Sequence, residues 1–196
     1  MLAIVSCQLE EDFQQIDNNA VPMTFYAGIE LPEDHVETKT ILGGSPSDKY
    51  RKVLWETDDE VYVTNETYSS KFINTAENGA NLAILEGELS QGSKYLAAYP
   101  YDIVTDYTSG AFNVNLPAVQ EYYEDGINPG TFPMVAKCNN GTFNFQNLCG
   151  IFVLQLLGEK TVSALTFSGE GETGNLLSVA GKGAVSMGYD DYPTLM

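Results

Sequence analysis

The sequence predicts an all-β protein built as a two-sheet antiparallel β-sandwich. Twelve tyrosines and nine phenylalanines among 196 residues favour strands, because aromatic side chains suit a half-buried pleated surface. Eighteen glycines and eight prolines provide the turns that many short strands require. Helices are not expected, since no window of helical length carries an apolar stripe with a 3.6-residue period.

Alternating apolar and polar residues place the individual strands. The first strand is the clearest, because five apolar residues share one face: Met23, Phe25, Ala27, Ile29 and Leu31. Short strands follow with turns between them, as two packed sheets require. They are predicted at residues 50–55, 59–64, 81–89, 94–101, 112–116, 143–145, 150–157 and 162–168.

Three details refine this arrangement. Residues 90–93 are predicted to join the strands on either side of them as a hairpin. Asn139-Asn140-Gly141 is a strong turn signal, since Asn and Gly tolerate positive φ. The nearly continuous apolar run 150–157 is predicted to be a central strand paired with 162–168.

The formal net charge of −18 limits the classes of partner. An acidic surface repels phosphate backbones, so nucleic acid is not expected to bind. It also repels anionic head groups, so the folded domain is not expected to lie on a membrane.

The residues that catalysis and metal binding use most are scarce. The single histidine, His35, lies in an acidic loop without a second histidine or cysteine at ligand spacing. No Gly-x-Ser-x-Gly sequence is present, and residues 169–172 carry carboxylates where a phosphate loop would be neutral. We therefore expect a non-enzymatic protein with no catalytic, cofactor or metal site.

The three cysteines do not form a disulfide framework. Cys138 lies beside the predicted turn, and Cys149 lies in an apolar run. Their spacing permits a bridge in an oxidising compartment without requiring one. Cys7 has a different setting, because it follows six mostly apolar residues.

Residues 1–7 resemble the lipobox of bacterial lipoproteins, in which Cys7 would become the acylated N-terminus. Two or more acyl chains anchor a protein stably where one does not. The apolar stretch is short and lacks a basic n-region, which departs from the usual leader. The acidic cluster that follows looks like the export signal of Bacteroidetes surface lipoproteins, and residues 8–20 are predicted to be a polar tether.

The folded region resembles the fimbrillin family of Bacteroidales type V pili and its minor-fimbrial relatives. The resemblance spans about residues 21–187, the predicted sandwich domain, and depends on several segments in order. They are Lys39-Thr40, 53–63 (VLWETDDEVYV), 95–101 (YLAAYPY), 116–120 (LPAVQ), 133–136 (PMVA) and 145–151 (FQNLCGI).

The resemblance implies a Greek-key, transthyretin-like sandwich on a lipoprotein of the outer membrane surface. It implies a pilus subunit or adhesin that assembles with other subunits by strand exchange, after a trypsin-like protease removes the first strand. The strand released would carry Met23 to Leu31, with a cleavage region at Lys49, Arg51 and Lys52. That strand is equally expected to be a permanent member of its sheet.

The sequence also supports a prediction for residues 188–196 and one alternative function. Residues 188–196 are predicted to begin a linker or second domain, where relatives would continue to a donor strand. A surface module that binds host or bacterial glycans or proteins is the alternative function. It would need exposed aromatic residues, for which the candidates are Tyr99, Tyr101, Tyr107, Tyr122 and Tyr123.

Overall fold

The chain is all-β, as the sequence predicts. The computed structural model describes residues 16–29, 41–43, 52–119, 132–149, 157–158, 163, 169–170, 176–177, 180–187 and 193–195. Within these ranges the one helix is η1 (Tyr101–Ile103), a single 3₁₀ turn. None of the described helical structure is long and apolar enough to cross a membrane.

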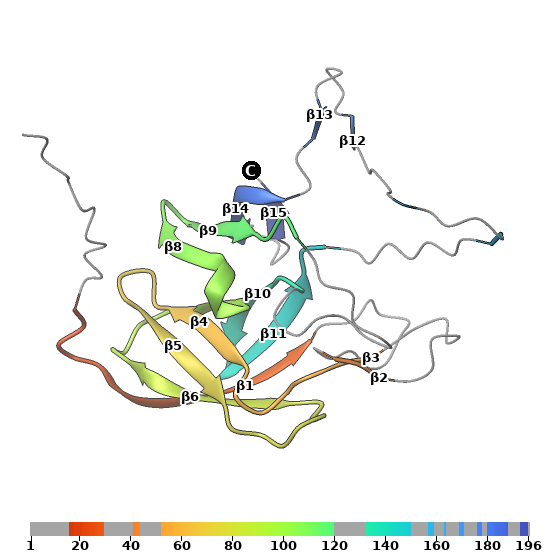
Figure 1. Cartoon of the computed structure of the whole chain (residues 1–196). Helices are drawn as coiled ribbons and strands as arrows, with labels where there is room; N and C mark the ends of the chain where they lie inside the picture. Colours follow the sequence, from red (N-terminus) through yellow and green to blue (C-terminus); the bar gives the residue numbers. More distant parts are fainter. Residues whose placement is uncertain are drawn as a thin grey trace, which may run out of the picture.

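Seven strands form a closed barrel (Figure 1). The first strand closes the ring, because it pairs with one neighbour on each side, antiparallel to β6 and parallel to β11. All other pairs in the barrel are antiparallel. Around the ring the order is β1 (Val21–Ile29), β11 (Thr142–Asn147), β10 (Met134–Asn139), β7 (Leu96–Tyr99), β4 (Glu60–Thr64), β5 (Ser69–Asn74) and β6 (Ala83–Leu89).

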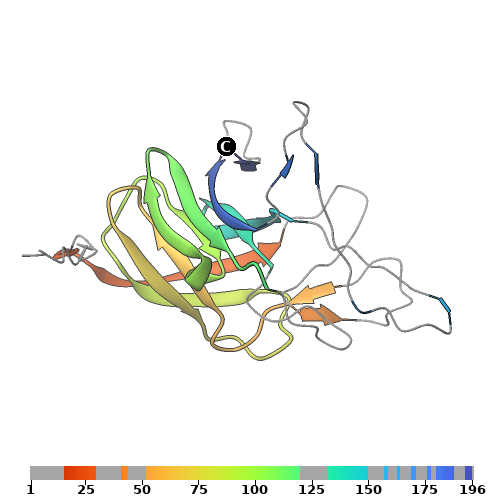
Figure 2. The ribbon, with the colours of Figure 1, turned by 45° about the horizontal axis from the view of Figure 1, so that its top comes forward.

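A second sheet lies against one wall of the barrel (Figures 1 and 2). Its order is β15 (Pro193–Leu195), β14 (Gly181–Met187), β9 (Ala111–Leu116) and β8 (Val104–Thr108). Two short pairs complete the described strands: β2 (Ile41–Gly43) with β3 (Lys52–Leu54), and β12 (Gly169–Glu170) with β13 (Leu176–Leu177).

The barrel interior is filled by aromatic and aliphatic side chains. The single tryptophan, Trp55, is fully buried and packs edge-on against Tyr99 and Phe145, with ring centroids 5.5 and 5.4 Å away. Such burial is the main favourable term in folding. The same cluster includes Phe25, Ala27, Val61, Val63, Phe72, Ala83, Leu85, Leu89, Ala97, Phe132, Met134, Ala136 and Phe143.

A second apolar layer joins the barrel wall to the outer sheet. It is formed where Phe112 and Val185 of the outer sheet meet Tyr62, Leu96 and Val135 on the outer face of the barrel. Strands β4 and β7 are therefore buried on both faces, which explains why residues 96–99 form a continuous apolar run.

The structure supports the all-β prediction, but its described strands are arranged as a barrel with a sheet beside it. The prediction of a two-sheet sandwich is finer than this architecture. One pairing is wrong: residues 90–93 do not join a hairpin, since β6 pairs with β1 and β5, whereas β7 pairs with β4 and β10. Side-chain contacts hold this loop instead, because Asn65 Nδ2 donates to the carbonyl and hydroxyl oxygens of Ser90.

Several local predictions are confirmed. Val61 and Val63 are buried in β4, and Phe143 and Phe145 are buried in β11. The turn between β10 and β11 has positive φ at its two central residues, Asn140 (51°) and Gly141 (81°).

Other predictions fall mainly on residues that the structure does not describe. The predicted pair 150–157 and 162–168 lies outside the described residues, apart from Leu157 and Ser163, which are exposed. At the chain end, residues 193–195 were predicted to belong to a linker or second domain, and they pair with β14.

Candidate functional site

The candidate site is β1 together with the space that it fills between β6 and β11, which we call the β1 groove. Of the predicted inward face, Phe25 and Ala27 are buried, and Met23 is half-buried against the core. Ile29 is the last residue of the strand, and Leu31 lies outside the described residues. The structure therefore places the described part of the predicted apolar face toward the barrel interior.

Phe25 occupies an aromatic cage at the centre of the groove. Its ring centroid lies 5.0 Å from that of Phe143, 5.1 Å from Tyr95 and 5.5 Å from Phe72. These separations are typical of favourable aromatic pairs, which add to the free energy of burial itself. The three cage residues come from β11, the loop before β7, and β5. Phe25 thus connects distant parts of the barrel.

Ala27 occupies a narrow part of the groove. It lies opposite Ala83 of β6 and Phe143 of β11, and both alanines are fully buried. Cross-strand neighbours have Cβ atoms only about 5 Å apart, so a large side chain at position 27 would overpack the barrel. The groove therefore requires an aromatic residue followed, two positions later, by a small one.

The outer face of β1 is polar and solvent-exposed. Thr24 lies opposite Glu86, and Tyr26 lies opposite Ile84 and Thr142 with 48% of its surface exposed. Side chains of different size can stand at these positions, because nothing covers them in the described part of the chain. Specificity in the groove comes from the inward residues.

Backbone and side-chain hydrogen bonds fix the register of β1. Ahead of the strand, the carboxylate of Asp17 accepts a hydrogen bond from the Ser90 amide at 2.7 Å. Within the strand, the Tyr26 amide donates to the Gly141 carbonyl at 3.0 Å, which starts the parallel ladder with β11. These contacts come from the loops at the ends of β6 and β10.

The predicted processing and lipidation residues fall mainly outside the described ranges. Cys7, Lys49 and Arg51 belong to segments that the structure does not describe. Lys52 is the first residue of β3, where its backbone pairs with Gly43. The proposed cleavage region therefore lies between the two strands of the β2–β3 pair, at the start of β3.

Cys138 and Cys149 are both free thiols. In the β10–β11 hairpin, Cys138 lies opposite Phe143, whereas the Leu148 amide bonds to the Pro133 carbonyl. Cys149 follows Leu148 and therefore lies near Pro133, five residues before Cys138 in the chain. Five residues of extended strand span about 16 Å, whereas the Cα atoms of two bridged cysteines lie within roughly 7 Å of each other. These two cysteines cannot form a disulfide with one another in this fold.

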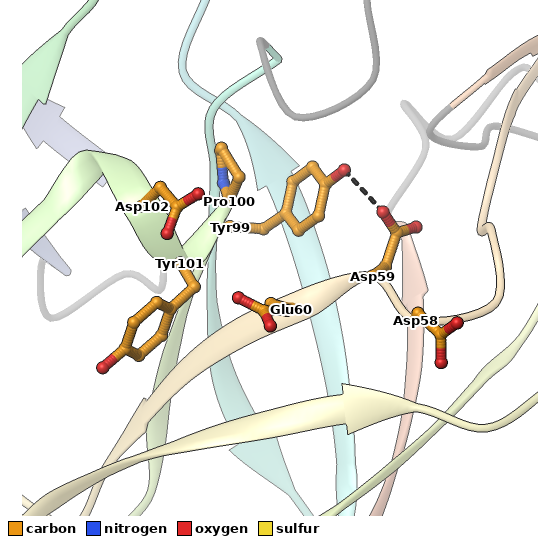
Figure 3. Close-up of a pocket in the computed structure, with 7 residues that line it drawn as sticks. All are labelled: Asp58, Asp59, Glu60, Tyr99, Pro100, Tyr101 and Asp102. Atoms are coloured by element: carbon orange, nitrogen blue, oxygen red, sulfur yellow. Dashed lines mark hydrogen bonds between the residues drawn. The ribbon is translucent and has the colours of Figure 1, made fainter.

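A pocket of about 250 Å³ opens where η1 meets the start of β4 (Figure 3). The Tyr99 hydroxyl donates a 2.8 Å hydrogen bond to Asp59 at its wall. Glu60 forms an ion pair with Lys71, whose ammonium lies 4.4 Å from the centre of the Tyr101 ring. The lining residues are Asp58, Asp59, Glu60, Tyr99, Pro100, Tyr101 and Asp102.

The tyrosines proposed for glycan binding do not share one environment. Tyr99 is only 2% exposed and belongs to the barrel core. Tyr101 is half-buried between Tyr62 and Lys71, and Tyr107 packs on Phe112. Tyr122 and Tyr123 lie outside the described residues. Among the three candidate tyrosines that the structure describes, only Tyr101 borders the pocket with part of its surface accessible.

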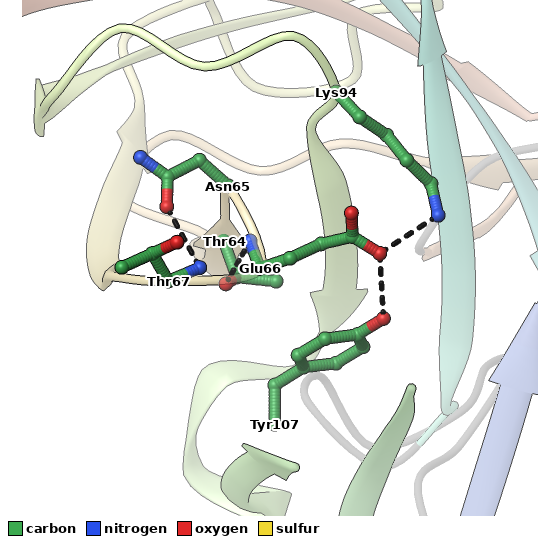
Figure 4. A network of polar contacts seen from close by, with 6 residues as sticks. All are labelled: Thr64, Asn65, Glu66, Thr67, Lys94 and Tyr107. Carbon is green, nitrogen blue, oxygen red and sulfur yellow. Dashed lines mark hydrogen bonds and ion pairs between the residues drawn. The ribbon is translucent and has the colours of Figure 1, made fainter. Parts of the chain in front are cut away.

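A polar network ties the β4–β5 turn to the outer sheet (Figure 4). Glu66 Oε1 accepts hydrogen bonds from Lys94 Nζ at 2.8 Å and from the Tyr107 hydroxyl at 3.2 Å. The bond from Lys94 lowers the pKa of Glu66, while burial and the nearby Glu66 charge raise the pKa of Tyr107 to about 12. Tyr107 therefore remains a donor at neutral pH.

This network predicts a small acid-dependent loss of stability. Because the pKa of Glu66 is lowered by folding, its contribution is present at neutral pH and is lost as the pH falls through the folded-state value. Both ends of the ion pair are over one-third exposed, so the contribution is at most about 1 kcal/mol. Glu66→Gln should reduce the loss of unfolding free energy between about pH 6 and about pH 3 by that amount.

Urea denaturation at each pH measures this effect. Glu88→Gln removes a carboxylate from an exposed position on β6 and serves as the matched control. Equal pH profiles for Glu66→Gln and the unaltered protein would show that the network contributes nothing to stability.

The comparisons with known proteins do not extend these observations. No protein-family model, no curated protein and no solved structure matches the chain. Within the described residues, no group of three or more His, Cys, Asp or Glu side chains could hold a metal ion. His35 lies in a segment that the structure does not describe.

Proposed function

We propose that the chain is a fimbrillin-like structural subunit or adhesin that assembles by exchange of β1. One observation carries the proposal: β1 is the first of the described strands, yet it closes the barrel and fills a groove between β6 and β11. Its removal would leave two strand edges unpaired and an aromatic cage open. A strand from another subunit would satisfy both.

The free energy of strand exchange favours an incoming strand that resembles β1. The β1 groove provides backbone hydrogen bonds along both sides and burial for Phe25 and Ala27. An incoming strand with equivalent residues restores these contacts, so the net free-energy change of exchange is small even though strand release alone is costly. Proteolysis between β1 and β3 would make release irreversible by separating β1 from its own chain.

The proposal also covers the fold type and the cellular location of the protein. The outer sheet and the barrel wall of β4, β7 and β10 face one another across one apolar layer, which supports a sandwich-derived, transthyretin-like fold. Acylation at Cys7 would hold the protein at the outer membrane surface, in contact with the membrane only through lipid. The partners would be other pilus subunits.

The single arginine makes the processing step directly testable. An arginine-specific protease can cut this chain only after Arg51, which would release β1 and leave a new N-terminus at Lys52. We expect cleavage of the native protein to yield Lys52 as the first residue and to convert monomers into oligomers. Size-exclusion chromatography with light scattering measures the change.

The matched control is Arg51→Gln, which removes the cleavage site without altering β1 or its groove. This variant should stay monomeric under the same treatment. Cleaved protein that remains monomeric at high concentration would refute strand exchange, and native protein that resists cleavage at Arg51 would refute processing there.

Glycan capture is the second candidate, favoured by the pocket beside Tyr101. Its carboxylates, Asp58 and Asp102 among them, are suitable acceptors for sugar hydroxyls. The two functions differ in one respect: glycan binding would occur in the uncleaved monomer and would not depend on oligomers. A glycan array probed with Arg51→Gln separates them.

A further inference from the structure

We propose that Asn140 is a site of spontaneous chemical modification that weakens the contact between β1 and β11. The residue lies at the tip of the β10–β11 hairpin, directly before Gly141, and is exposed to solvent. Asparagine is chemically labile, above all before glycine, because the next backbone amide then approaches the side chain without hindrance from a Cβ atom. This inference goes beyond strand exchange and does not depend on it.

The reaction joins the Gly141 backbone nitrogen to Cγ of Asn140. The bond between Cγ and the side-chain nitrogen breaks, and ammonia leaves with the proton that the Gly141 nitrogen gives up. Water then opens the resulting cyclic imide. Attack of water at Cγ gives aspartate in a normal chain. Attack at the main-chain carbonyl carbon gives isoaspartate, whose main chain passes through Cβ and Cγ and is one atom longer. Water is the sole co-reactant.

The chain contains a second Asn-Gly pair, Asn78-Gly79, which the fold protects. Both asparagines are exposed, so access of solvent does not distinguish them. In the second pair, Asn78 Oδ1 accepts a 2.6 Å hydrogen bond from the Thr57 amide. The Gly79 amide donates a 2.9 Å hydrogen bond to the carbonyl of Trp55, which is fully buried. The side chain and the attacking amide are therefore both held in place.

The corresponding groups at the hairpin tip are held less firmly. The Asn140 side chain has no hydrogen-bond partner in the described part of the chain. Burial raises the pKa of the Cys138 thiol and a hydrogen bond from the Gly141 backbone lowers it, but sulfur is a weak acceptor. A Cβ atom built on Gly141 would meet no other atom within 4 Å, so the Asn140 side chain has room to turn toward the amide. Asn140 should therefore react before Asn78.

Modification acts on β1 through the Gly141 carbonyl. This oxygen accepts a 3.0 Å hydrogen bond from the Tyr26 amide, which begins the parallel ladder between β1 and β11. The turn that presents it is short, since Asn139 pairs with Thr142 directly across it. Such a turn cannot take up an extra main-chain atom unless Gly141 moves. Isoaspartate at position 140 should therefore weaken this edge of the β1 groove.

Peptide mapping by mass spectrometry tests the site. Native protein is incubated in mildly alkaline buffer, and conversion of the side-chain amide to a carboxyl group is followed at Asn140 and Asn78. We expect conversion at Asn140 to be at least about tenfold faster, since breaking two hydrogen bonds of ordinary net strength slows a reaction by about that factor.

The unfolded chain is the control for this measurement. In urea the two Asn-Gly pairs should react at similar rates, because neither is held by the fold. Equal rates in the folded protein would overturn the assignment of the site. So would a folded protein in which Asn140 does not react although the chain in urea does.

Hydrogen exchange of the Tyr26 amide tests the effect on β1. Protein with isoaspartate at position 140 should exchange this amide about tenfold faster than unmodified protein, the effect of losing one hydrogen bond. The amides of β4, which pairs with β5 and β7, are the reference. Asn140→Asp is the matched control, because it adds the same charge without the extra main-chain atom and should keep the native exchange rate.

Two results would overturn the effect on β1: unchanged exchange at Tyr26 in the isoaspartate form, or equal acceleration in Asn140→Asp. Strand exchange is judged separately, by the oligomers that form after cleavage at Arg51.

Discussion

Phe25→Ala is expected to lower the free energy of unfolding by about 3–5 kcal/mol, the usual cost of deleting a buried phenylalanine. The ring is 6% exposed and lies within 5.5 Å of three other rings. Its loss leaves a cavity lined by side chains of β5, β11 and the loop before β7. Urea denaturation followed by the fluorescence of Trp55, the only tryptophan, measures the change.

Tyr26→Ala is the control for this prediction, because Tyr26 is the adjacent residue on β1 and its ring is 48% exposed. Tyr26→Ala should lower the free energy of unfolding by well under half as much as Phe25→Ala. Similar losses for the two variants would mean that β1 does not direct Phe25 into the barrel.

Phe112→Ala should destabilise the protein by a similar amount, about 3–5 kcal/mol, through the second apolar layer. Phe112 is fully buried and packs edge-on against Tyr107 at 5.0 Å and Tyr62 at 6.1 Å. Tyr62 belongs to the barrel and Tyr107 to the outer sheet, so the cavity would weaken the contact between the two sheets.

The control on the same strand is Asn115→Ala, since Asn115 is exposed on β9. It should change stability by less than about 0.5 kcal/mol. Unfolding followed by Trp55 should remain a single transition in Phe112→Ala, because β4 and β7 contribute side chains to both apolar layers. A native-like unfolding midpoint for Phe112→Ala would show that the outer sheet contributes little to stability.

Local features of the fold could be predicted from sequence because their causes are local. Alternation placed Phe25 and Ala27 on one face of the first strand, and the Asn140-Gly141 turn follows from the tolerance of these residues for positive φ. The strand bounds differ by two residues, since β1 spans Val21–Ile29 rather than 23–31.

The long-range pairing could not be predicted in the same way. Parallel pairing of β1 with β11 joins residues more than 110 positions apart, and nothing in either strand specifies its partner. The loop at 90–93 has the composition of a hairpin turn, yet Asn65 and Asp17 hold Ser90 in a crossover. Contacts from outside the segment decided its path.

The candidate site was predicted in part. The inward face of β1 was identified from its pattern, whereas the cage around Phe25 depends on rings from three separate parts of the chain. The restriction to a small residue at Ala27 depends on Ala83, which becomes its neighbour only through the β1–β6 register.

Hydrogen exchange of residues 83–89 tests the central claim most directly, because β6 loses one of its two partners when β1 leaves. The account predicts protected amides in the intact chain, faster exchange in cleaved monomers, and restored protection in oligomers. Protection that is unchanged by cleavage, or that remains lost in oligomers, would contradict exchange of the first strand.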